Sequence, residues 1–216
     1  MPAGLQIIGS HGIAQIDETY KNFVVVASGS KASGDWAVSG VSYFVNIVVS
    51  DAVAPLLAFK CAEFVALSNT AISGATWTIT LRTNNPAALD YWVFDESPST
   101  SPASVGIEIY NSAGARVYHS AQKPLRVAGT GAGTYTSGRT YAVIRADPGF
   151  ASSTTATGLP FPEEWQFDGA IEAAKVVSNV VTAGGVTTDN ALVSPKPGVF
   201  TAAYIGPTLV IDVTYF

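Results

Sequence analysis

Side chains that could carry acid–base, nucleophilic or metal chemistry are scarce in this chain of 216 residues, which has two histidines, one cysteine and 16 acidic residues. His11 and His119 are too few for a three-histidine zinc site, and they lack the i,i+4 spacing of a helical metal pair. Cys61 lies in the apolar run LAFKCAEFV, where a buried thiol is more common than a nucleophile. We therefore predict no metal site, and we assign both histidines to turns or the surface.

Two further stretches could bind a ligand through polar groups. Glu163 and Glu164 lie beside Trp165 and could flank a sugar. Neighbouring residues on a strand point to opposite faces, so these carboxylates would not converge on one bond as a glycosidase needs. The glycine-rich run 129–133 is similar to a phosphate loop, but such a loop opens a helix, and the strand-like residues 141–144 follow it instead. We predict no catalytic residue and no cofactor, and hence a protein that is not an enzyme.

Composition excludes several classes of protein. Only 12 % of the residues are charged, about half the usual share, while 48 % are hydrophobic, which excludes a disordered acidic chain. The net charge of -5 and the pI of about 4.9 would repel a phosphate backbone, so no nucleic-acid partner is expected. The apolar stretches 41–49 and 53–67 contain polar residues and are shorter than the roughly 20 residues of a membrane helix. We expect no membrane insertion. We also expect the chain to be made in a reducing cytoplasm.

Alternation of apolar and polar residues predicts that strands dominate the fold. Residues 76–81 and 208–215 alternate with period two, and clusters of Gly, Pro, Asn and Ser separate such runs. Residues 55–67 carry apolar side chains of one parity, which favours a strand. Residues 168–180 have apolar spacings of three but are rich in valine, so helix and strand both stay open. We predict an all-β, mostly antiparallel fold with little helix.

An internal repeat is visible at an offset of 102 residues. The segment GLQIIGSHG at 4–12 matches GIEIYNSAG at 106–114, and the match continues without a gap to Gly29 and Gly131, with seven identities in 26 positions. Both copies have the pattern of a strand, a glycine-bearing turn, a second strand and a third strand. The alternative is two unrelated hairpins in a β-rich chain.

If the repeat is real, each copy opens a module. The segment 97–104 contains two prolines and no apolar alternation, which is typical of an extended linker, with a long loop inside one domain as the alternative. We therefore predict two related antiparallel β-sandwich modules in tandem, 1–96 and 105–216. The chain printed here ends on a strand, and Phe216 would expose apolar area unless it packs in its own sheet or against a neighbour.

Aromatic residues are the best indication of binding. The chain has 10 Phe, 9 Tyr and 4 Trp alongside few charges. Aromatic rings give large contact areas at low entropic cost, which suits protein interfaces and sugar stacking. Low charge with much apolar surface also suits a subunit buried in an assembly. The candidate interaction residues are Trp36, Tyr135, Phe161, Trp165 and Phe216.

The second copy of the repeat resembles a group of viral proteins. The sequences GIEIYNSAG at 106–114, VYHS at 117–120 and KPLRV at 123–127 are similar to the opening hairpins of small structural proteins from the tail tip or baseplate of tailed bacteriophages. Residues 1–7, MPAGLQI, fit the same opening. The resemblance is confined to the hairpins and departs at His119, where Asp is commoner. It implies a non-enzymatic part of a virion.

The expected function is therefore that of a structural virion subunit made in the host cytoplasm. It would be present in several copies and would dock other tail or baseplate proteins through β hairpins and apolar or aromatic patches. The alternative is a receptor- or carbohydrate-binding β-sandwich module, in which Trp36, Tyr135 or Trp165 stacks on a host surface glycan. A glycan hydrolase is a third hypothesis, which requires two carboxylates within about 10 Å that face one cleft.

Overall fold

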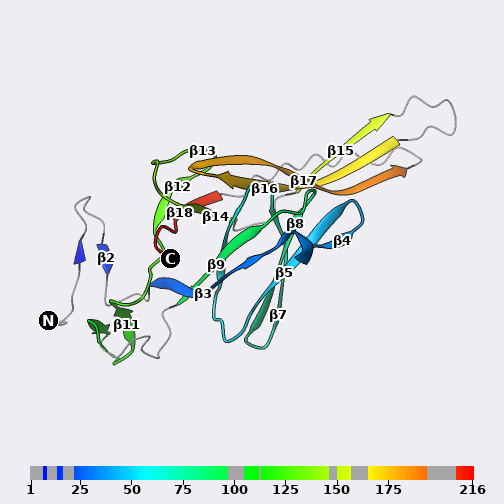
Figure 1. Cartoon of the computed structure of the whole chain (residues 1–216). Helices are drawn as coiled ribbons and strands as arrows, with labels where there is room; N and C mark the ends of the chain where they lie inside the picture. The colour runs from blue at the N-terminus through cyan, green and yellow to red at the C-terminus, as the bar shows by residue number, and fades with distance from the viewer. Residues whose placement is uncertain are drawn as a thin grey trace.

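The computed structural model describes residues 7–8, 14–16, 22–96, 105–111, 113–145, 150–156, 165–193 and 208–216. Within these ranges the regular structure is strand apart from one 3-10 turn, η1 (Ser33–Asp35), which confirms the all-β prediction. No helix among the described residues is long and apolar enough to cross a membrane. The strands, drawn in Figure 1, are β1 (Ile7–Ile8), β2 (Ala14–Ile16), β3 (Phe23–Lys31), β4 (Ala37–Ser39), β5 (Ser42–Val49), β6 (Leu56–Cys61), β7 (Ala66–Ser73), β8 (Thr76–Thr83), β9 (Leu89–Glu96), β10 (Glu108–Tyr110), β11 (Arg116–His119), β12 (Val127–Thr130), β13 (Gly133–Thr134), β14 (Tyr141–Arg145), β15 (Phe150–Ala156), β16 (Trp165–Val177), β17 (Val180–Val193) and β18 (Thr208–Asp212).

The centre of the fold is a six-stranded antiparallel sheet with the order β12-β18-β14-β6-β9-β3. Its strands come from both sides of the segment 97–104, because β14 pairs with β6, with Val143 opposite Phe59 and Ile144 opposite Ala58. Strands of the two predicted modules therefore share one sheet. The module boundaries themselves stay predictions, since residues 97–104 lie outside the described residues.

The internal repeat recurs in the pairing of the two hairpins. In the first hairpin, Ile7 pairs with Ile16 and a register shift follows. In the second, Ile109 pairs with Tyr118 and a register shift follows at the same place. Each residue of the second pair lies 102 residues after its counterpart in the first pair, which is the offset found in the sequence. The shared register and irregularity favour a true repeat over two unrelated hairpins.

The two halves of the central sheet are built alike. Val25 of β3 lies opposite Phe94 of β9 and a bulge follows, while the repeat-related Val127 of β12 lies opposite Ile211 of β18 and a bulge again follows. β6 pairs with β9 as β14 pairs with β18, so β3-β9-β6 and β12-β18-β14 are equivalent three-stranded units. Because the equivalent strands β6 and β14 meet in antiparallel orientation, an approximate two-fold axis relates the units.

The central sheet closes on itself where its two outer strands begin. Val25 N donates a hydrogen bond to Lys123 O at 2.9 Å, and Leu125 N donates to Phe23 O at 2.8 Å. This seam encloses an apolar cluster on the inner face of the sheet. Its buried members are Ala58, Phe94, Ala142, Ile144, Ile211 and Val213, and its partly buried members are Phe23, Val25, Leu56, Trp92, Leu125, Leu209 and Phe216.

Two four-stranded sheets pack on the other face of the central sheet, with the orders β4-β5-β8-β7 and β13-β17-β16-β15. The main core lies between these layers and contains Phe59, Leu81 and Val181, one from each sheet. β16 lies beside the start of β7, where Val65, the residue before β7, and Ala174 exchange backbone hydrogen bonds of 3.0 Å. Figure 1 shows β15, β16 and β17 extending away from this core as an arm.

The two segments with ambiguous patterns both form strands. Residues 168–180 are strand and turn, because β16 runs to Val177 and β17 begins at Val180. Residues 55–67 contain β6 and the start of β7 with a break between them, so the strand prediction is confirmed but covers two strands.

Candidate functional site

Two of the predicted interaction residues are held by the fold itself. Trp36 is only 6 % exposed, and its Nε1 donates a hydrogen bond to Ala87 O at 2.9 Å. Tyr135 is half-buried, its hydroxyl donates to Gly131 O at 2.9 Å, and its ring centroid lies 5.3 Å from that of Tyr141. Burial raises the pKa of the Tyr135 hydroxyl. Trp36 therefore does not form the exposed stacking platform expected of it, and the Tyr135 ring already has an aromatic partner.

Phe216 packs against its own fold. Its ring centroid lies 6.0 Å from that of Phe94, which belongs to the enclosed cluster. The Arg126 guanidinium lies 4.8 Å and the Lys123 Nζ 5.8 Å from the centre of the same ring. Of the two alternatives for this residue, packing within its own sheet is the one found. Several of the predicted residues lie outside the described residues, namely Phe161, His11, Glu163 and Glu164. The backbone of Trp165 begins β16, but its side chain also lies outside the described part.

Asp212 fixes the end of β18 near Phe216. Its carboxylate accepts a hydrogen bond from Thr214 N at 2.9 Å and another from Arg139, and Arg126 lies 3.9 Å away. Burial by itself would raise the pKa of Asp212, but the hydrogen bonds from Thr214 and Arg139 and the charge of Arg126 hold that pKa below its ordinary value. The network is structural, because each of its charges is used to hold the last strand in place.

His119 is buried, so the surface alternative is wrong for it, whereas it does begin a turn in which Gln122 N donates a hydrogen bond to His119 O at 3.0 Å. The residue is 1 % exposed at the end of β11, and its Nδ1 accepts a hydrogen bond from Ala121 N at 3.0 Å. Its Nε2 lies 3.7 Å from Glu108 Oε1, which also binds Arg116 Nη1 at 2.9 Å. A Cβ on Gly106 would lie 2.7 Å from the His119 ring, so glycine is required there. These contacts lock the second hairpin and leave the imidazole no access to a substrate.

Two other expectations about chemistry are confirmed. Cys61 is 2 % exposed, and burial raises the pKa of its thiol, as expected of an unreactive core residue. The glycine run 129–133 spans the end of β12 and the start of β13, and strand β14 follows it instead of a helix. In the part of the chain that the structure describes, no group of three or more His, Cys, Asp or Glu residues is placed to hold a metal ion.

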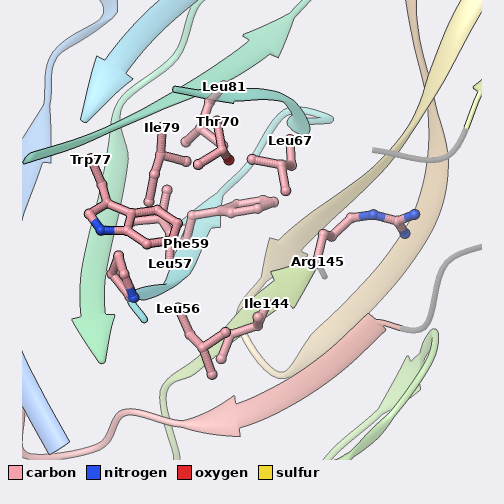
Figure 2. A pocket seen from close by; sticks show the side chains of 11 residues that line it. Leu56, Leu57, Phe59, Leu67, Thr70, Trp77, Ile79, Leu81, Ile144 and Arg145 are labelled. Carbon is pink, nitrogen blue, oxygen red and sulfur yellow. The ribbon is translucent and has the colours of Figure 1, made fainter. Parts of the chain in front are cut away.

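A half-open apolar cavity of about 260 Å³ lies between the sheet β4-β5-β8-β7 and the strands β6 and β14 (Figure 2). Its walls come from the three consecutive strands β6, β7 and β8 and from the distant strand β14. They are Pro55, Leu56, Leu57 and Phe59 at β6, Leu67 and Thr70 on β7, Trp77, Ile79 and Leu81 on β8, and Ile144 and Arg145 on β14. No histidine or carboxylate is among them, so the cavity suits an apolar group rather than a reaction.

Arg145 is the one charged residue in the cavity lining, and its charge is already used. Its Nη2 donates a hydrogen bond to Glu172 Oε2 at 2.6 Å, and its Nη1 donates to Thr208 Oγ1 at 2.8 Å. Figure 2 shows that the guanidinium points away from the apolar side chains. The aliphatic part of Arg145 therefore contributes to the cavity wall, and the ionic group does not.

The cavity opens beside the free edge of β7. This strand ends its sheet, and beyond the Val65–Ala174 contact no described strand pairs with its outer side. The sequence of β7, ALSNTAIS, contains no charge and no proline. Residues 69–73 are exposed, and Ile72 is 59 % exposed.

No protein-family model, curated protein or solved structure matches this chain. Its function must therefore be inferred from its own geometry. The cavity and the edge of β7 are the features that sequence reasoning missed. One signal was present in the sequence, namely the eight uncharged residues of β7, which lack the protection usual in an edge strand.

Proposed function

We propose that this chain is a structural subunit of a larger assembly, of the kind that forms the tail tip or baseplate of tailed bacteriophages. The observation that carries the proposal is that both outer sheets end in uncharged, proline-free strands, β7 and β15. An edge strand presents unpaired backbone groups, and proteins that stay monomeric usually protect them with charges, proline or a covering loop. In a subunit, such edges are where neighbouring chains add strands.

Exposed apolar side chains support the same proposal. At the start of the second hairpin, Val105 is 85 %, Ile107 65 % and Tyr110 51 % exposed, with Val105 and Ile107 just before β10. Clusters of large exposed apolar residues mark interaction surfaces more often than free surfaces. This hairpin is the element that carries the resemblance to virion proteins, so its exposed apolar residues are expected to contact other tail or baseplate proteins. The role is mechanical, with several copies held in place by their neighbours.

The test is peptide mass spectrometry of purified tailed particles from the virus or prophage that encodes the chain. We expect the chain in washed particles at a constant ratio to the major tail protein across independent preparations. Particles of normal morphology that lack the chain would contradict the proposal. Native mass spectrometry of the isolated chain gives a second measurement, in which self-association or binding of a tail protein is expected.

A further inference from the structure

The free edge of β7 and the cavity beside it provide two kinds of binding group in one place. Past Val65, alternate backbone N–H and C=O groups of β7 point outward without a described strand to pair with them. Such a row of groups binds any chain in an extended conformation, whatever its sequence. The edge by itself therefore gives affinity without selectivity.

The side chains of β7 connect this edge to the cavity. Asn69 lies opposite Thr80 on the outer face of the sheet, whereas Thr70 lies opposite Ile79 on the inner face that lines the cavity. Ile72, two residues further along, shares the inner face and is 59 % exposed. At the edge of this sheet the inner, apolar face is thus uncovered, next to the unpaired backbone.

The size and charge of the cavity decide which group it takes. A volume of about 260 Å³ is smaller than the roughly 300–1,000 Å³ of typical small-molecule sites. One or two apolar side chains fill such a space. The guanidinium of Arg145 is bound to Glu172 and points away, so the cavity offers a ligand no free charge. The complementary group is therefore an uncharged, apolar side chain.

We propose that an extended, uncharged strand of another polypeptide adds to the free edge of β7 and places a large apolar side chain in the cavity. The backbone hydrogen bonds hold the strand, and the cavity selects for the side chain that enters it. The proposal deepens the proposed function and rests on it, because the docked strand belongs to a neighbouring subunit of the assembly.

The test uses the full chain and five dye-labelled peptides, Thr-Val-Thr-Xaa-Thr-Val-Thr, with Ala, Val, Leu, Phe or Trp at the central position. Fluorescence anisotropy measures their affinities, and hydrogen exchange measures the protection of β7. We expect the affinity to rise at least about tenfold from Ala to Leu or Phe, because only the larger side chains fill the cavity. The amides of residues 66–73 should exchange more slowly in the presence of the Phe peptide.

Two tryptophan substitutions on β7 form a matched pair. Thr70→Trp places a large ring at the mouth of the cavity and should weaken binding of the Phe peptide at least about tenfold. Asn69→Trp places the same ring on the outer face and should leave the affinity within about threefold. Circular dichroism and thermal melting check that both variants fold. If Thr70→Trp does not fold, the exchange data on the unaltered chain decide the matter.

Several results would overturn the proposal: no binding by any of the five peptides, affinities that are independent of the central residue, unchanged affinity in folded Thr70→Trp, or unchanged exchange along β7. Binding of the apolar dye anilinonaphthalene sulfonate in the cavity, with no peptide protecting β7, would assign the site to a small molecule instead. The particle experiment is independent, so the chain can be found in virions even if β7 binds no strand.

Discussion

Ala58 and Ile144 lie directly opposite each other where β6 meets β14, and they occupy equivalent positions in the two halves of the chain. Ala58 pairs with Trp92 of β9, just as Ile144 pairs with Leu209 of β18. The approximate two-fold axis of the sheet therefore passes between them. A small side chain faces a large one at this axis, and both residues are almost fully buried in the enclosed cluster. This pairing lets the two units meet closely without a clash between two large side chains.

Truncation at the axis is expected to destabilise the whole sheet. Ile144 is 2 % exposed, so Ile144→Ala should lower the free energy of unfolding by about 2–5 kcal/mol through lost burial and the cavity left behind. Val48→Ala is the control, because Val48 is 62 % exposed and its loss should cost at most about 0.5 kcal/mol. Denaturant unfolding measures both values. Equal losses in the two variants would contradict the central role of the axis.

The lowered pKa of Asp212 predicts that the folded chain loses stability in acid. Its pKa is lowered in the folded state, so its contribution is complete above the ordinary Asp pKa of about 3.9 and is lost as the pH falls toward the lower, folded value. Asp212→Asn should flatten the dependence of the unfolding free energy on pH in this acid range. It should also cost about 1–3 kcal/mol near neutral pH, because Thr214 N and Arg139 lose a charged acceptor at a buried position.

The matched control for this pH series is Asp90→Asn, which removes the same charge from an exposed position on β9. Unfolding is measured from about pH 6 down to about pH 2. An acid slope in Asp212→Asn as steep as in the unaltered chain would show that the network around this carboxylate does not cause it.

Adjacent glycines of β17 should respond differently to the same substitution. A Cβ on Gly184 would lie 2.5 Å from Phe64 Cε1, whereas the nearest atom to a Cβ on Gly185 is Ile171 O at 3.7 Å. Gly184→Ala forces the Phe64 ring from its place, where Lys175 Nζ lies 4.7 Å from its centre, and should cost about 1–3 kcal/mol. Gly185→Ala should be neutral or slightly stabilising. Calorimetry gives the two melting temperatures, and a reversed order would contradict the predicted contact.

Cys61 should serve as a reporter of unfolding. Its thiol is buried and its pKa is raised by burial, so a thiol-reactive dye should label the native chain at least about a hundredfold more slowly than the unfolded chain. The rate should rise with denaturant in step with the loss of structure. Rapid labelling of the folded chain would show that β6 opens locally.

The strands were largely predictable from sequence where one face is buried and the other is not. In β8, Ile79 and Leu81 are buried and alternate with half-buried threonines, which produces a clear period of two. β16 was ambiguous for a physical reason. Ala173 and Ala174 are adjacent and both buried, because this strand packs on two sides, and burial on both faces removes the alternation.

The repeated hairpins were also predictable, because glycine spacing and apolar pattern set the local register. The shared sheet was not, since nothing in the local pattern tells β14 to pair with a strand whose partner residue, Phe59, lies far earlier in the chain. The cavity was missed for the same reason, because the local pattern does not show that β14 lies beside β6. The burial of Trp36 was missed because a count of aromatic residues does not show which indole finds a backbone acceptor, here Ala87 O.

The approximate two-fold sheet is equivalent to a symmetric dimer whose subunits have been fused into one polypeptide. Dilution cannot separate the two units, because their association is intramolecular and has a fixed effective concentration. The units nevertheless differ in what surrounds them, since among the described residues the longest strands, the 13-residue β16 and the 14-residue β17, lie in the second half of the chain. The two halves of this sheet therefore present unlike surfaces on a common scaffold.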